Sequence, residues 1–206
     1  MYVEATRAIL AATTLSVLLI SGRANAAEGD WLVRVGGHYV DPKSNNHPVV
    51  SVDSSESLTF NATYFYTDHW GIELLAAAPF KHDITLNSNG SKVAETRELP
   101  PTLSLQYHFA PNGTIRPYVG LGLNATIFFN EKTRGALAGN KLSLDTSFGP
   151  AAQVGVDFAL AGDWFVNVDA RWIDIDSDAK LGGAGIGTVS IDPLAFGISI
   201  GRRFGK

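Results

Sequence analysis

The chain has 206 residues, of which 45% are hydrophobic and 17% are charged, and its formal net charge at pH 7 is −4. The absence of cysteine excludes disulfides, a thiolate nucleophile and a thiolate metal site. The sequence has no basic cluster or stripe, so we expect no nucleic-acid partner. Beyond residue 26 no run of about 18 apolar residues occurs, which excludes membrane-spanning helices from the mature chain.

Residues 1–26 have the pattern of a secretory signal peptide. Arg7 precedes an apolar run over residues 8–20, and Ala24-Asn25-Ala26 fits a small-residue cleavage site. An amphipathic N-terminal helix is the alternative, but the run has no polar stripe. We therefore predict a signal peptide over 1–26 and a single mature domain over 27–206.

The mature chain alternates apolar and polar residues with the period of two that is typical of β-strands. The clearest example is a hairpin in residues 102–129, where Leu103, Leu105 and Tyr107 alternate with Ser104 and Gln106 before the turn at 110–113. The same alternation predicts eight strands, which cover approximately residues 30–40, 57–67, 70–85, 93–109, 116–130, 142–160, 164–176 and 189–204.

The connections between these strands alternate between long and short. The long ones are expected at residues 41–56, 86–92, 131–141 and 182–187, and the short ones at 68–69, 110–114 and 161–163. Outer-membrane barrels have an even number of strands, short periplasmic turns and longer extracellular loops. We therefore predict an all-β fold, an eight-stranded antiparallel transmembrane β-barrel in the outer membrane of a Gram-negative envelope. A soluble barrel would have to hide its apolar outer stripes, and no helix is available to cover them.

Aromatic residues fall where the strands meet the short turns, as in the aromatic girdles of membrane barrels. They are Trp31, Tyr66, Trp70, Tyr107, Phe109, Phe158 and Trp164.

Several segments resemble the OmpW family of small outer-membrane proteins. They are PTLSLQY at 101–107 followed by His108-Phe109, RPYVGLGL at 116–123, FGPAAQVGVD at 148–157, NVDAR at 167–171, and Asp192-Pro193. The resemblance implies a narrow, porin-like hydrophobic channel for transport of small hydrophobic molecules. The expected partners of such a barrel are outer-membrane lipid and the outer-membrane assembly machinery. One departure from the family pattern concerns the C-terminal signal that this machinery recognises. Chains of this family usually end on an aromatic residue, whereas Gly205-Lys206 follow Phe204 here.

Charged residues on the inward face gather in the periplasmic half of the predicted barrel. An eight-stranded barrel leaves room for side chains only, and isolated buried ions cost several kcal/mol, so these groups must pair. We interpret them as a polar floor that plugs the lumen, and the alternative of a proton or ion path has no specific support. The floor residues are Arg34, Glu73, Arg116, Asp157, Asp169, Arg171 and Arg203.

Farther from the periplasm the inward positions become apolar, which indicates an extracellular funnel for an apolar ligand. A strand register that is wrong by one residue would exchange the two faces and remove this funnel. The predicted substrate pathway consists of Val40, Leu75, Ala77, Pro79, Phe128, Pro193 and Ala195.

Two prolines predict a weak point in the wall. Pro79 and Pro101 both lie eleven residues from Gly90, near the expected tip of the hairpin, so we expect them to face each other. Neither has a backbone N–H to give to the sheet. A lateral opening into the membrane is one interpretation, and a bulge or kink without a transport role is the other.

Other functional classes receive less support from the sequence. The five histidines are scattered and form no recognisable catalytic motif, so we predict no enzyme activity, catalytic residue, metal site or cofactor. A structural or receptor barrel that conducts nothing and binds partners through its extracellular loops stays open as the alternative to a channel.

Overall fold

The computed structural model of the chain describes residues 28–205. The predicted signal peptide lies outside these residues. The described part consists of β-strands and one 3-10 turn, η1 (Gly135–Leu137). No helix within it is long and apolar enough to cross a membrane.

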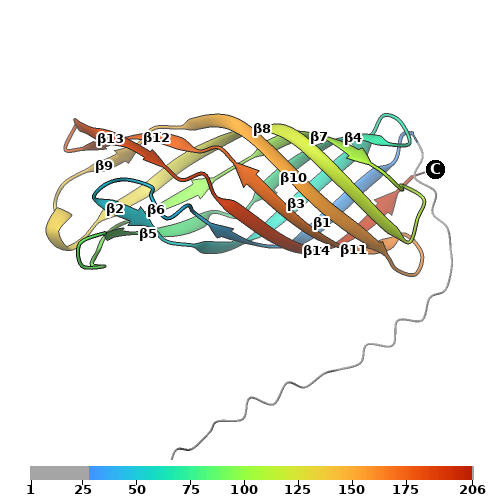
Figure 1. The fold of residues 1–206 in the computed structure, drawn as a ribbon, viewed down its shortest axis with the longest axis horizontal. Coiled ribbons are helices and arrows are strands. Elements are labelled where there is room, and N and C mark those ends of the chain that lie inside the picture. Colours follow the sequence, from blue (N-terminus) through green and yellow to red (C-terminus); the bar gives the residue numbers. More distant parts are fainter. Residues whose placement is uncertain (1–27, 206) are drawn as a thin grey trace, which may run out of the picture.

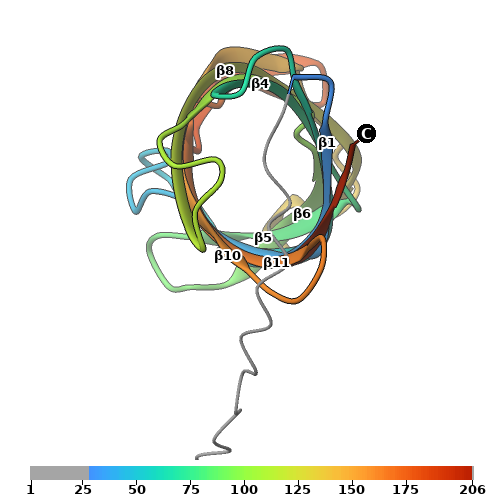
Figure 2. The ribbon, with the colours of Figure 1, turned by 90° about the vertical axis from the view of Figure 1, so that its right-hand side faces the viewer.

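Eight strands close into an antiparallel barrel, which Figure 2 shows end-on as a ring. The β1 strand pairs with the last strand, from Trp31 opposite Phe204 to Asp41 opposite Leu194, and this pairing closes the ring. The eight-stranded antiparallel fold predicted from the alternation is thus confirmed. In order around the barrel the strands are β1 (Trp31–Asp41), β3 (Ser55–Phe65), β4 (Trp70–Ala77), β7 (Thr102–His108), β8 (Ile115–Thr133), β10 (Ser147–Ala159), β11 (Trp164–Ile173) and β14 (Leu194–Phe204).

Six shorter strands extend the wall at the end with the long connections, on the left in Figure 1. Three of them, β2 (Val50–Val52), β5 (Phe80–Leu86) and β6 (Lys92–Leu99), continue the barrel sheet beside β8. The other three, β9 (Leu142–Leu144), β12 (Asp176–Leu181) and β13 (Ala184–Ser190), form a separate sheet. Three of the predicted strands, 70–85, 93–109 and 142–160, are therefore split in two. The β2 strand and most of the β12–β13 hairpin lie in stretches that the sequence analysis did not assign to strands.

Burial is inverted relative to a soluble protein. Leu121, Leu123 and Phe148 are 72%, 73% and 79% exposed, whereas the Arg34 and Glu73 side chains inside the barrel are 0% exposed. Apolar side chains on the outer wall are stable only against lipid, and the lumen must then accommodate the polar face of each strand. We assign the short-turn end, where both ends of the described chain lie, to the periplasm.

Candidate functional site

The carboxylate of Glu73 on β4 is the centre of the lumen floor. Arg171 on β11 donates to Oε1 at 2.8 Å, and Arg34 on β1 lies 3.4 Å from Oε2. Asn61 and Gln153 donate to the same two oxygens at 3.2 and 3.1 Å. Four strands thus place hydrogen-bond donors around one buried carboxylate. These donors offset the free-energy cost of removing the charged carboxylate from water.

The network continues on both sides of this centre. Arg34 also binds Asp157 through Nη2 at 3.0 Å, and Arg171 binds Asp169 through Nε at 2.8 Å. His38 extends the chain, because its Nε2 lies 3.0 Å from Asp169. Five of the predicted floor residues therefore form one connected network. The sequence analysis did not assign His38 to this network. Its position on the inward face of β1, four residues after Arg34, could have indicated that it belongs there.

The remaining two predicted floor residues are also buried but bind the periplasmic turn. Arg116 donates from Nε to the Gly113 carbonyl at 2.8 Å, and the Arg203 guanidinium lies 3.5 Å from the Pro111 carbonyl. Both arginines therefore tie the short turn at residues 110–114 to the bottom of the barrel.

Apolar side chains fill the lumen above the floor. One cluster joins Val40, Phe80 and Ala195, with Ala77 packed against it. A second cluster lies farther toward the extracellular end and contains Val52, Phe128, Ala151, Ile173, Ile175, Ala179, Val189 and Ile191. An enclosed cavity of about 20 Å³ between Phe128, Ile84 and their neighbours has room for one water-sized group. The funnel expected from the sequence is thus a packed apolar segment.

The predicted pathway residues take three different positions. Val40, Leu75, Phe128, Pro193 and Ala195 are buried inside the barrel, and Ala77 is half-buried. Pro79 is exposed, and its neighbour Phe80 is buried instead with 2% exposure. The prediction that Pro79 faces the lumen is wrong, because the alternation slips by one residue between β4 and β5 and exchanges the faces.

The slip coincides with an interruption in the barrel wall. Pairing of β4 with β7 ends at Leu75 opposite Thr102, and pairing of β5 with β6 begins at Phe80 opposite Glu98. In the described chain no ladder pair joins residues 76–79 to residues 99–101. The two flanking registers differ by one residue, and neither places Pro79 opposite Pro101. The predicted proline pair is therefore wrong.

We call this interruption the seam. It separates β4–β5 from β6–β7, whereas the pairing of β6 and β7 with β8 on the other side is intact. Leu99 pairs with Ile127 and Thr102 with Asn124, so β6 and β7 keep a continuous register along β8 across Pro100 and Pro101. The Pro101 carbonyl still accepts a hydrogen bond from the Ala125 N–H at 3.0 Å. The interruption is thus a local gap in hydrogen bonding between β4–β5 and β6–β7.

A family model described as "OmpW family" matches residues 27–204. The chain belongs to the OmpW family. It is 41% identical over 213 residues to "Outer membrane protein W" of Escherichia coli K12, an alignment that covers 97% of this chain and 98% of the relative. The recognition made from the short segments is confirmed, and so is the outer-membrane location.

Two further comparisons concern a solved structure and a second relative. The crystal structure of OprG from Pseudomonas aeruginosa has a TM-score of 0.78 and 31% identity, covering 88% of this chain and 99% of that one. The "Dibenzothiophene metabolism operon protein PahQ", also from Pseudomonas aeruginosa, is 29% identical over 194 residues, covering 87% of this chain and 90% of the relative.

This OmpW-family barrel has a further buried ionisable pair that is separate from the floor. It lies in the extracellular extension, the part of the wall formed by the six shorter strands and the end of β8. His82 Nε2 lies 3.3 Å from Glu98 Oε1, both side chains are 1% exposed, and the other ring nitrogen contacts the Asp53 carbonyl at 2.7 Å. Burial lowers the pKa of His82, but the neighbouring Glu98 carboxylate and the Asp53 carbonyl outweigh it, so the pKa lies above its usual value. These two residues border the enclosed cavity, and the sequence analysis missed their pairing.

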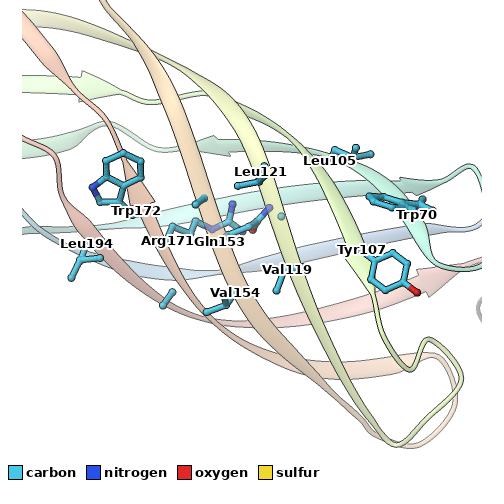
Figure 3. A pocket seen from close by; sticks show the side chains of 13 residues that line it. Trp70, Leu105, Tyr107, Val119, Leu121, Gln153, Val154, Arg171, Trp172 and Leu194 are labelled. Atoms are coloured by element: carbon cyan, nitrogen blue, oxygen red, sulfur yellow. The ribbon is translucent and has the colours of Figure 1, made fainter.

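The outer wall of the OmpW-family barrel also carries an apolar groove of about 650 Å³, shown in Figure 3. The short side chains of Ala152 and Ala170 lie there between larger neighbours such as Leu121, Val154 and Trp172. The groove crosses the lipid-facing side of β8, β10 and β11, so we expect lipid acyl chains to occupy it in the membrane. It does not belong to the lumen pathway.

Proposed function

We propose that this barrel is an outer-membrane channel that takes up small hydrophobic molecules. The observation that carries the proposal is the order of environments along the lumen, in which packed apolar side chains lie above a paired ionic floor and beside an interrupted wall. An apolar molecule would enter from the extracellular end, stop at the floor and leave sideways into the membrane.

The floor argues against a straight path to the periplasm. Glu73, Arg34 and Arg171 fill the cross-section with mutual ion pairs. An apolar molecule passing between them would separate buried charges without replacing their partners, which is costly. A sideways path avoids this cost.

The interrupted seam supplies the sideways path in this proposal. Ala77 and Phe80 border the gap and also belong to the apolar lumen cluster. A molecule among these side chains would therefore reach lipid without breaking ladder hydrogen bonds between β4–β5 and β6–β7. The pathway residues of the proposal are Val40, Leu75, Ala77, Phe128, Pro193 and Ala195, with Pro79 and Pro101 at the lateral opening.

The substrate class rests on the lining and on one relative. The lining offers aliphatic and aromatic surface, which suits ligands that lack charge. The name of PahQ refers to a dibenzothiophene metabolism operon, which agrees with an apolar substrate. Because the enclosed cavity is only about 20 Å³, passage requires side chains such as Phe128 to move. The proposal involves no catalytic step and no cofactor.

Uptake measurements test the proposal. Cells that lack their own OmpW-family proteins should accumulate labelled naphthalene faster when they produce this chain, and glucose uptake should not change. Equal naphthalene accumulation with and without the folded protein would contradict a channel. The tight packing of the upper lumen favours the second candidate in that case, a structural or receptor barrel that binds partners through its extracellular loops.

A further inference from the structure

Two positive side chains lie directly opposite each other on the outer face of the extracellular extension. Lys81 on β5 pairs with Arg97 on β6, and both are exposed. Like charges on directly opposite residues destabilise a strand pair. Lys81 has Glu95 at 3.2 Å, but within the described residues no carboxylate lies within ion-pair distance of the Arg97 guanidinium. The position therefore favours an external anion.

More cations surround this pair than the local carboxylates can neutralise. Glu95 has cationic nitrogens of Arg134, Lys81, Lys92 and Lys132 at 2.7, 3.2, 3.8 and 3.9 Å. Asp83 shares Lys92, at 2.6 Å. Together with Arg97, the side chains in these contacts are five cations and two carboxylates, an excess of three positive charges among them, in a chain whose net charge is −4. They come from β5, β6, β8 and the residue that follows β8.

The height of the pair relative to the lipid belt points to one kind of anion. Leu99 pairs with the outward Ile127, and two residues farther Arg97 pairs with Phe129. Two residues of a strand span about 7 Å. Arg97 therefore lies directly above the last apolar pair of the outer wall, at the level of lipid head groups, and Phe129 provides an aromatic neighbour of the kind found at membrane interfaces.

We propose that the outer face of β5, β6 and β8, with Lys81 and Arg97 at its lower edge, binds the phosphate groups of a phosphorylated lipid in the outer leaflet. The two cations take one phosphate from opposite sides, and Lys92, Lys132 and Arg134 lie farther out for additional negative charge. Charge complementarity and continuity with the lipid-facing belt support a lipid as the occupant. The proposal is independent of transport, since all these side chains are outside the lumen.

The other side of the extension provides a matched control. Its charged residues near β9 and β12 include Asp145, Asp176, Asp178 and Lys180, with Lys180 bound to Asp145 at 2.7 Å. Acidic residues predominate there. Removing Lys141 and Lys180 deletes the same charge from the extension as removing Lys81 and Arg97, but at a place without excess positive charge.

The test measures the affinity of the purified full chain in detergent for diphosphorylated lipid A, by native mass spectrometry. The reference ligand is lipid A without phosphates, and inorganic phosphate is the third probe. The double variant Lys81→Gln, Arg97→Gln should bind diphosphorylated lipid A roughly thirtyfold more weakly than the wild type, as expected for two cations removed from an anionic surface. The control Lys141→Gln, Lys180→Gln should retain the wild-type affinity.

Two outcomes would overturn the proposal. One is equal affinity of the wild-type protein for phosphorylated and dephosphorylated lipid A, which is informative even if the double variant does not fold. The other is inorganic phosphate displacing the lipid at equal concentration, since the face would then be a general anion site. Heat-modifiable mobility on gels verifies that each variant is a folded barrel.

Discussion

Arg171 donates from Nη1 to Oε1 of Glu73 at 2.8 Å across the whole lumen, although the two residues are 98 apart in the chain. They lie on β11 and β4, which are on opposite sides of the eight-stranded ring. The contact braces the barrel internally, and the same carboxylate also holds Arg34. The floor therefore contributes to stability as well as blocking the straight path.

Replacing Glu73 with alanine should lower the free energy of unfolding by about 3 kcal/mol or more, because Arg34 and Arg171 lose a shared partner while they stay buried. The urea unfolding midpoint in detergent measures this loss. Glu56→Ala, at an exposed carboxylate on β3, is the control and should change stability by less than about 0.5 kcal/mol. Wild-type stability of the Glu73 variant would mean that water reaches the floor.

A methyl group at Gly197 should also disturb the floor. A Cβ at this position would overlap the His38 ring, which binds Asp169 at 3.0 Å. Gly197→Ala should cost about 1–3 kcal/mol as an overpacking change. Gly185→Ala is the matched control, because no atom lies within 4 Å of its Cβ. Equal thermal stability of the two variants would contradict the packed floor.

The pair of His82 and Glu98 predicts a dependence of stability on pH. The folded-state pKa of His82 lies above its usual value, so the pair stabilises the fold fully below about pH 6.5. This contribution is lost as the pH rises through the folded-state pKa. Melting temperatures of the wild type and His82→Gln should differ most at acidic pH and converge at alkaline pH. A constant difference would mean that His82 does not titrate, and His47→Gln serves as the control.

Surface labelling tests the orientation of the barrel. A tag at Asn45 or Ala138 lies in the extracellular extension and should be accessible on intact cells, whereas a tag at Asn112 in a short turn should be protected. The rule that long loops face outward supports this assignment. Labelling at Asn112 alone would invert it.

Much of the barrel was predictable because lipid on one side and a packed lumen on the other impose a strict period of two. Leu103 and Leu105 are outward and Ser104 and Gln106 inward, as the alternation indicated. The charged floor was predictable for the same reason. Its individual partners, such as Glu73 and Arg171, were not, because they join strands that do not pair with each other.

The extension was the harder part to predict. At Pro79 a slip of one residue exchanged the two faces, and nothing in the local sequence specifies such a slip. The positive face around Lys81 and Arg97 was missed because its members come from β5, β6 and β8, so no basic cluster appears along the chain. Contacts between distant segments and irregular registers are the information that alternation does not contain.

A reversible covalent staple across the interrupted seam tests the transport account most directly. The natural chain has no cysteine, so Ala76→Cys with Pro101→Cys introduces one thiol pair, at positions that continue the β4–β7 register beyond Leu75 and Thr102. Leu74→Cys with Leu103→Cys, an existing ladder pair on the same strands, is the control.

Both staples should leave the barrel folded. The control pair has the spacing of opposite ladder residues, which suits a disulfide, and Ala76 and Pro101 directly follow the last ladder pair, Leu75 and Thr102, so their backbones are held close. We expect oxidation to reduce naphthalene uptake at least tenfold in the Ala76 and Pro101 pair and reduction to restore it, while the control pair transports in both states. Undiminished uptake in a fully oxidised, folded Ala76 and Pro101 protein would contradict the lateral exit.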